Sequence, residues 1–569
     1  MNSIACVIRR IKPESAPRLS LSLVLLALTA GGCSTVPQQP STNSAALPSA
    51  AALRILDRIT WGTNASTARE VSERGIDRYL AAQLKPDAAN ARLPEPVEAQ
   101  IAAMTITQRP LVPLVVALEQ QRKDGDANKI DDQQQRRGGD ANMIDDKQQR
   151  KDGDASKIDD KQQRKGGDAN KIDDKQAARQ AYRQELTRLG REASTRSLLR
   201  AVYSRNQLQE QMTWFWFDHF NVNQNKGILR ALIGDYEDRA IRPHALGRFR
   251  DLLQAVVHHP AMLLYLDNAR NASGRINENF ARELMELHTL GADGGYTQRD
   301  VQELARVLTG VGVNLGPNIP NVRPRLQSQY VRDGLFEFNP NRHDYGDKEL
   351  LGLRLRGEGL QEVDAALDRL ARHPSTARFV SRKLATYFVA DDPPAALVER
   401  MAREFERSDG DIAATLSTLF AAPEFTASLG GKFKDPMHYV VSAVRLAYDD
   451  KPILNAGPML YWLNRMAEPL HGRQTPDGYP LTSGAWTSSG QMATRFEIAR
   501  AIGMGSAGLF RVEDANAGER APPPQLSNAL FHEHLQPRLS QPTRAALEQA
   551  GSPQEWNVFL LASPEFMNR

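Results

Sequence analysis

The ionisable residues best placed for chemistry lie in the run His343-Asp344-Tyr345-Gly346-Asp347, which has the composition of a polar loop. A carboxylate near a neutral imidazole can tune that imidazole as a general base, and the two groups together can hold a divalent cation. Loops often carry function, and His343 and Asp344 serve no helical apolar stripe. We therefore interpret them as a candidate metal-binding or acid–base site. The alternative is that Asp and Gly are present only to form a turn.

A second pair of ionisable residues, Asp218 and His219, lies within a strongly aromatic stretch. The aromatic residues indicate a core segment rather than a ligand-stacking surface: Trp214, Trp216, Phe217 and Phe220. Asp218 and His219 could supply a catalytic base, or they could be a buried polar pair whose members satisfy each other. We favour the second interpretation and keep both residues as candidates.

The densest polar cluster follows the period of a helix. That period predicts a buried stripe of Ile276, Phe280, Leu284 and Leu287. On the exposed side, Arg282 stands one turn from both Glu278 and Glu286 and can bridge the two acids. Glu283 and His288 fall at opposite borders of the stripe, so they cannot share a metal ion from one helix. The paired histidines of a zinc protease are absent from this segment.

The corner after this helix offers either a polar pocket or a well-capped helix hairpin. The pocket would be lined by Asn279, Glu283, Asp293 and Tyr296. In the hairpin interpretation, Gly291 ends the first helix, and Thr297 with Asp300 forms a capping box for the second. We favour the hairpin and keep Glu283 and Asp293 as catalytic candidates.

The elements that must position these residues are mainly helices. From Ala177 onward, apolar residues recur three and four apart, which predicts a mainly α fold with one large multi-helix domain. Proline at the first helical position marks tight helix corners, which we expect at His259-Pro260, His373-Pro374, Ala422-Pro423 and Ser563-Pro564. We also expect one short β-hairpin, in which residues 335–338 pair with residues 348–353.

A repeated segment interrupts this helical pattern. A 14-residue unit recurs four times between Arg122 and Lys175, with balanced charge and one Ile per unit, so the tract cannot bury a core. Asp124, Asp126 and Asn128 resemble the first ligands of a calcium loop, but Lys129 stands where such a loop needs glycine. We therefore predict a disordered insertion over residues 122–175.

The N-terminal residues resemble a lipoprotein signal peptide. A basic stretch precedes the apolar residues 21–30, a run of about ten where a membrane-spanning helix needs about twenty. Small residues then lead to Cys33, which predicts removal of residues 1–32 and attachment of a lipid to Cys33. Ser34 favours sorting to the outer membrane. Residues 33–50 have the composition of a flexible tether, so the folded domain is expected over residues 51–569.

Cysteine content and charge exclude several classes of function. Of the two cysteines, Cys6 leaves with the signal peptide and Cys33 takes the lipid, so no thiol remains for a disulfide or for thiolate catalysis. The net charge of +4 falls to +1, because residues 1–32 contain four basic residues and one acidic residue. This balance argues against nucleic acid as a partner. The sequence contains no phosphate-binding loop, dinucleotide-binding glycine pattern or nucleophile elbow, so the cofactor is unknown.

Four stretches together resemble a bacterial family of exported proteins known as domain of unknown function 1800. They are Arg58-Ile-Thr-Trp-Gly62, Trp214-Phe-Trp-Phe-Asp-His-Phe-Asn-Val-Asn223, residues 277–298 and Thr475-Pro-Asp-Gly-Tyr-Pro480. The resemblance implies a largely helical exported protein, often encoded beside another exported protein. It supplies no catalytic residue, and the repeats depart from its pattern.

Two functions fit these observations. The first is a non-enzymatic one, in which a lipid-tethered helical scaffold or assembly factor works in the cell envelope with another exported protein. The second is a periplasmic or surface hydrolase that uses carboxylates and histidines drawn from Asp218, His219, Glu283, Asp293, His343 and Asp344. Convergence of at least three of these side chains on one cleft would favour the hydrolase.

Overall fold

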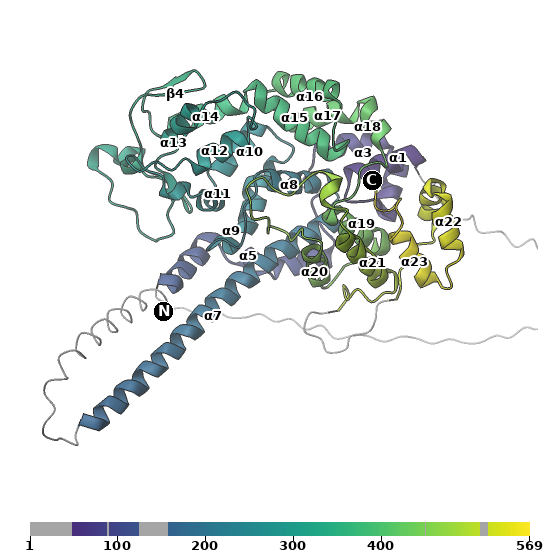
Figure 1. The fold of residues 1–569 in the computed structure, drawn as a ribbon, viewed down its shortest axis with the longest axis horizontal. Helices are drawn as coiled ribbons and strands as arrows, with labels where there is room; N and C mark the ends of the chain where they lie inside the picture. The colour runs from purple at the N-terminus through teal and green to yellow at the C-terminus, as the bar shows by residue number, and fades with distance from the viewer. Residues whose placement is uncertain (1–47, 88–89, 124–156, 450, 512–521) are drawn as a thin grey trace, which may run out of the picture. The chain divides into compact units, whose positions relative to one another are not determined.

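The computed structural model describes residues 48–87, 90–123, 157–449, 451–511 and 522–569 (Figure 1). All of them belong to the unit Ala46–Arg569. The expected signal peptide, Cys33, the tether up to residue 47 and residues 124–156 of the repeat tract lie outside the described residues.

Local capping starts the first helices. The Ser49 hydroxyl accepts a hydrogen bond from the Ala52 amide, and the Asn64 side chain accepts one from the Thr67 amide, so each satisfies a free N–H of its helix. Helical residues 111–123 follow the short helices of this part of the chain: α1 (Ala50–Ile59), α2 (Ala65–Arg74), α3 (Ile76–Gln83), α4 (Glu95–Ala102) and α5 (Thr105–Gln108).

The long helix α7 (Lys157–Tyr203) differs from our expectation for the repeats. It includes residues 157–175, where we predicted disorder. The repeat units contain several Lys, Arg and Gln residues, which have high helix propensity, although their Asp and Gly residues do not. They also adjoin a segment that is already helical, and extending a helix is far easier than starting one.

The middle of the chain is a series of short helices around α8 (Gln207–His219). They are α9 (Leu229–Asp235), the π-helix η1 (Tyr236–Ile241), the 3-10 helix η2 (Arg242–His244), α10 (Phe249–Val257), α11 (Pro260–Tyr265), the 3-10 helix η3 (Asn268–Arg270), α12 (Asn279–Glu286) and α13 (Gln298–Val307). Trp216 and Phe217 of α8 are fully buried in a cluster with apolar residues of α9, η1 and α10. The core interpretation of this aromatic stretch is confirmed.

The expected proline corners occur at Pro260, Pro374 and Pro423, each the first residue of a helix. The preceding His259 and His373 act as caps, because their Nδ1 atoms accept hydrogen bonds from the Ala261 and Ser375 amides. The expectation at Pro564 was wrong, because that proline lies in a turn after α23 (Pro553–Leu561).

Two of the observed strands, β3 (Phe336–Phe338) and β4 (Lys348–Leu350), lie where we expected strands, but the other three were not expected and the predicted pairing was wrong. Strand β3 pairs with β1 (Val311–Val313) and β2 (Val331–Asp333), whereas β4 pairs with β5 (Leu353–Leu355). Leu351 and Gly352 connect β4 to β5 with φ angles of 48° and 76°. This tight turn joins neighbouring strands locally, and such turns define hairpins. Two 3-10 helices, η4 (Pro324–Gln329) and η5 (Pro340–Arg342), flank these strands.

The C-terminal half is helical and contains a second apolar cluster, which includes residues of the helices Pro436–Tyr448 and Ser489–Gly503. Its elements are α14 (Leu360–Ala371), α15 (Pro374–Phe388), α16 (Ala395–Arg407), α17 (Ile412–Phe420), α18 (Pro423–Ser428), α19 (Pro436–Tyr448), α20 (Gly457–Arg465), η6 (Ser483–Ala485), α21 (Ser489–Gly503), η7 (Phe531–Leu535), η8 (Gln536–Arg538), α22 (Gln541–Glu548) and α23. The fold is mainly α, as predicted (Figure 1).

Two buried arginines join the ends of this unit. Arg58 in α1 donates hydrogen bonds to the carbonyl oxygens of Ser428, at 2.7 Å, and Arg569, at 2.5 Å. Arg569 in turn donates to the Arg58 carbonyl oxygen over 3.3 Å. Residues more than five hundred positions apart therefore lie side by side. None of the helices in the described ranges is both long and apolar enough to span a membrane.

Candidate functional site

His343, the leading candidate of the sequence, is a buried link between three elements. Its Nδ1 lies 2.8 Å from the Thr309 carbonyl oxygen, and its Nε2 lies 3.1 Å from Oε2 of Glu362 in α14. Lys348 of β4 donates to the same Glu362 oxygen over 2.8 Å, while the Gly357 amide donates to the other oxygen. Burial acts to raise the pKa of Glu362, but the hydrogen bonds from His343 and Lys348 hold it below its usual value. Neither His343 nitrogen is left for a substrate.

Asp344 is held in the same way by neighbouring groups. Arg306 of α13 donates to its two oxygens over 2.9 and 3.2 Å, and the Gly346 amide donates to Oδ1. The hydrogen bond from Arg306 is the main reason that the pKa of Asp344 lies below its usual value. Within the part of the chain that the structure describes, no group of three or more His, Cys, Asp or Glu side chains is arranged to hold a metal ion. These contacts favour the turn interpretation of the loop.

Asp218 and His219 are both buried at the end of α8, but they point to different partners. Asp218 Oδ1 accepts a hydrogen bond of 2.5 Å from the Tyr479 amide. His219 Nε2 lies 3.0 Å from the His288 carbonyl oxygen. The expected mutual pairing was therefore wrong, because consecutive residues on a helix face different directions. Each side chain ties α8 to a distant segment instead.

The loop of residues 473–480 lies directly over the end of α8. Asn221 donates to the carbonyl oxygens of Arg473, at 3.0 Å, and Thr475, at 2.8 Å. A side chain at Gly478, whose φ is +78°, would overlap the Asp218 carbonyl oxygen. Glycine is therefore required for this close approach. Together with the His288 contact, these bonds bring three of the four sequence motifs to one place.

We define the junction as the place where the end of α8, His288 and the loop of residues 473–480 meet. Lys383 of α15 also lies there, and the sequence did not single it out. Its side chain is half-buried, and its ammonium makes no hydrogen bond or ion pair with any described residue. Burial lowers its pKa, against the attraction of Asp218 and Asp477. Phe379, Lys383 and Tyr387 stand on one face of α15, so a lysine within an otherwise aromatic stripe was the available signal.

Burial and the Lys383 charge control the ionisation of the groups around it. Burial raises the pKa of Asp218 to about 7, although the Tyr479 amide and Lys383 oppose this effect. Burial, assisted by Lys383, lowers the pKa of His288 to about 3 and that of His219 well below its usual value. The junction thus combines neutral imidazoles, a carboxyl group that titrates near neutrality and an unpaired amine.

A family model described as "Protein of unknown function (DUF1800)" matches residues 54–568, nearly the whole of the described domain. The chain belongs to the DUF1800 family. No curated protein and no solved structure matches it.

The remaining candidates of this DUF1800 protein lie beside the junction. Glu283 is half-buried in α12, and burial followed by repulsion from Glu286 raises its pKa. Asp293 is exposed in the corner after α12. The capping box of Thr297 and Asp300 is present, and Gly291 has a φ of +82°, as a helix end requires. These features confirm the helix hairpin.

Two details of the α12 prediction were wrong. The helix begins only at Asn279, so Ile276 precedes it and is 40% exposed instead of lying in the buried stripe. Arg282 pairs with Glu278 over 3.0 Å and donates to Gln298 over 2.9 Å rather than bridging to Glu286. The start of α13 brings Gln298 within reach, and sequence spacing within one helix cannot reveal such a partner.

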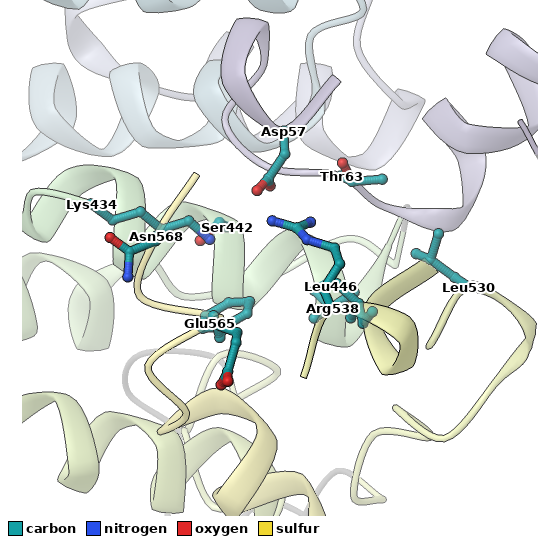
Figure 2. Close-up of a pocket in the computed structure, with 11 residues that line it drawn as sticks. Asp57, Thr63, Lys434, Ser442, Leu446, Leu530, Arg538, Glu565 and Asn568 are labelled. Carbon is teal, nitrogen blue, oxygen red and sulfur yellow. The ribbon is translucent and has the colours of Figure 1, made fainter. Parts of the chain in front are cut away.

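A second unusual lysine of the DUF1800 domain lies in a small pocket beside α1, α19 and the C-terminal residues. Figure 2 shows Lys434, Asp57 and Arg538 pointing into this space. The Lys434 side chain is 2% exposed, its Nζ lies 4.1 Å from the centre of the Phe566 ring, and burial lowers its pKa to about 8. The pocket volume of about 20 Å³ has room for a water molecule but not for a substrate.

Proposed function

We propose that this protein is an exported lipoprotein, anchored in the outer membrane through Cys33, whose helical domain acts as a scaffold or assembly factor in the cell envelope. The small residues before Cys33 and the tether composition support the anchor. The partner is another exported protein, as the family resemblance implies. No nucleic acid is involved.

The observation that carries the scaffold role is how the candidate catalytic groups are used. His343 and Asp344 bind Thr309, Glu362 and Arg306. Asp218 and His219 instead bind Tyr479 and His288, so the two sets share no partner. Each group joins segments that are far apart in the sequence. Side chains engaged in this way stiffen a domain, and a rigid surface suits a scaffold.

The anchor is tested by Cys33→Ser. We expect this variant to lose incorporation of a labelled fatty acid and to leave the membrane fraction, because the lipid is attached through the thiol of that residue. Cys6→Ser is the matched control, since Cys6 is expected to leave with the signal peptide, and it should keep both label and location. Equal labelling of wild type and Cys33→Ser would contradict the anchor.

The scaffold role predicts a stoichiometric protein partner when the full chain is solubilised in detergent and recovered by affinity purification. The partner should be another exported protein and should remain bound to the variant Lys383→Met, because α15 keeps its apolar packing in that variant. If the chain is recovered without a partner even after cross-linking and purification in a mild detergent, the scaffold role is contradicted.

A hydrolase remains the second candidate, and the specific observation that favours it is the junction around Lys383. An unpaired amine near a carboxyl group that titrates close to neutrality can exchange protons with a substrate. Under this alternative, Lys383→Met would abolish hydrolysis of an envelope substrate while circular dichroism and partner recovery stayed unchanged. The same variant therefore separates the two functions.

A further inference from the structure

A groove of about 700 Å³ lies on the side of the domain formed by α2, the segment after residue 91, the end of α7 and the end of α19. Its volume lies within the range typical of small-molecule sites. The groove is separate from the junction at α8, because Asp218, His219 and Lys383 do not line it. Its lining combines charged, hydroxyl and apolar side chains.

Unpaired positive charge distinguishes the rim of this groove. Arg69, Arg92 and Arg205 line it and are exposed, and their guanidinium groups make no hydrogen bond or ion pair with any described residue. Five arginines and three acidic residues line the groove, so the acids offset the positive charge only in part; Glu73 is exposed and makes no ion pair with any described residue. Glu70 is paired with Arg74, and both oxygens of Asp449 accept hydrogen bonds from Ser66, at 3.1 and 2.7 Å.

The floor of the groove is built from buried polar residues. Arg445 is 2% exposed and is fixed by hydrogen bonds to the Gly62 carbonyl oxygen, at 2.9 Å, and to the Thr67 hydroxyl, at 3.2 Å. Tyr79 is 1% exposed, and its hydroxyl makes no hydrogen bond with any described residue. Burial raises the pKa of Tyr79, so the phenol stays neutral and its O–H can donate a hydrogen bond. The Tyr79 hydroxyl is therefore available to a hydrogen-bond acceptor of a ligand in the groove.

We propose that this groove binds an acidic oligosaccharide. Planar guanidinium groups pair with carboxylates through two parallel hydrogen bonds, so the three free arginines suit acidic groups spaced along a chain. The Tyr79 phenol suits a sugar hydroxyl. Leu93 and Pro94, which are half-buried, provide an apolar surface for the C–H faces of sugar rings. This ligand goes beyond the scaffold role and does not depend on it.

The lining argues against single-stranded nucleic acid as the ligand of the groove. Such ligands stack their bases on exposed aromatic rings. The aromatic residues of the groove, Tyr79 and Tyr203, are 1% and 8% exposed, so neither offers a ring face. The groove therefore supplies charge and hydrogen bonds without a stacking platform.

The test is calorimetric titration of the full chain in detergent with tetragalacturonate, neutral galactotetraose and a short polyphosphate. We expect binding of tetragalacturonate that weakens as salt is added, and at least tenfold weaker binding of galactotetraose. The variant Arg69→Gln/Arg92→Gln/Arg205→Gln should bind tetragalacturonate at least tenfold more weakly. Arg299→Gln/Arg403→Gln/Arg500→Gln removes the same charge from exposed arginines outside the groove and should bind normally.

Tyr79→Phe tests the floor separately, because the ring and its packing are kept while the hydroxyl is lost. It should weaken tetragalacturonate binding several-fold and leave the thermal transition unchanged. The proposal is overturned by absence of tetragalacturonate binding, by equal losses in the two triple variants, or by tighter binding of polyphosphate than of tetragalacturonate. The last result would assign the groove to phosphate groups.

Discussion

Glu362→Ala is expected to lower the free energy of unfolding by about 4 kcal/mol, because removing one partner of a buried charged cluster leaves the other without compensation. The Lys348 ammonium and the His343 ring would then face an empty space in a region where both side chains are fully buried. Urea unfolding followed by circular dichroism measures the change. Glu358→Ala is a matched control, since Glu358 is exposed four residues away and its side chain makes no hydrogen bond or ion pair with any described residue. Its effect should stay within about 0.5 kcal/mol.

The pH dependence gives a second measurement of the same cluster. The pKa of Glu362 is lower in the folded state than its ordinary value of about 4.3. The carboxylate therefore contributes its full stabilisation above that ordinary value and loses it as the pH falls through the folded pKa. The stability difference between wild type and Glu362→Ala should shrink at acid pH. Similar midpoints for Glu362→Ala and Glu358→Ala at neutral pH would contradict the structural role of this cluster.

Lys434→Met is expected to raise the free energy of unfolding by up to about 3 kcal/mol at pH 7. This gain corresponds to a pKa of about 8 in the folded state against the ordinary value of about 10.4 for lysine. At pH values below the folded pKa, the buried charged ammonium lowers the free energy of unfolding by its full amount. As the pH rises from about 8 to about 10.4 this destabilisation disappears, so the gain from methionine should disappear with it.

Lys451→Met is the control for this prediction. Lys451 is exposed, and its Nζ lies 4.2 Å from the centre of the Phe510 ring, so it has the same kind of ring contact without the burial. Its replacement should change stability little at any pH in this range. Thermal unfolding of both variants from pH 6 to 10 measures the difference. A Lys434→Met variant that is less stable than wild type at pH 7 would show that the Phe566 contact outweighs desolvation.

Local physical chemistry explains which parts of the fold were predictable from the sequence. Helix periodicity, the Thr297 capping box and the prolines at positions 260, 374 and 423 act within a few residues, and the structure contains all of them. The strand pairing failed because we did not predict β2 and β5, the strands nearest in the sequence to β3 and β4. Gly334 permits the sharp link from β2 to β3, and Leu351 with Gly352 links β4 to β5, so each strand of the predicted hairpin already had a nearer neighbour.

The candidate site was predictable only in part, because the partners of its side chains come from distant parts of the sequence. Asp218 and His219 were identified from their place in a motif. Their hydrogen-bond partners, Tyr479 and His288, could not be identified in this way, because those residues are distant in the sequence. The sequence offered no structural partner for His343 in its loop, but in the structure its ring contacts Glu362 of α14. Lys383 belongs to none of the sequence motifs, and its lowered pKa comes only from its burial in the folded structure.

The sequence by itself determined the family, the mainly α class and the helix starts at Pro260, Pro374, Pro423 and after Thr297, since these depend on motif order, periodicity and capping within short stretches. The tertiary structure alone decided which ionisable groups are engaged in hydrogen bonds or ion pairs and which remain available to a ligand. It buried Lys434 against the Phe566 ring, enclosed His343 in a structural cluster, and left the guanidinium groups of Arg69, Arg92 and Arg205 without an ion pair among the described residues, around a groove floored by Tyr79. Burial and pairing are properties of segments brought together by folding, and electrostatic free energies in the low-dielectric interior depend on them far more than on residue type.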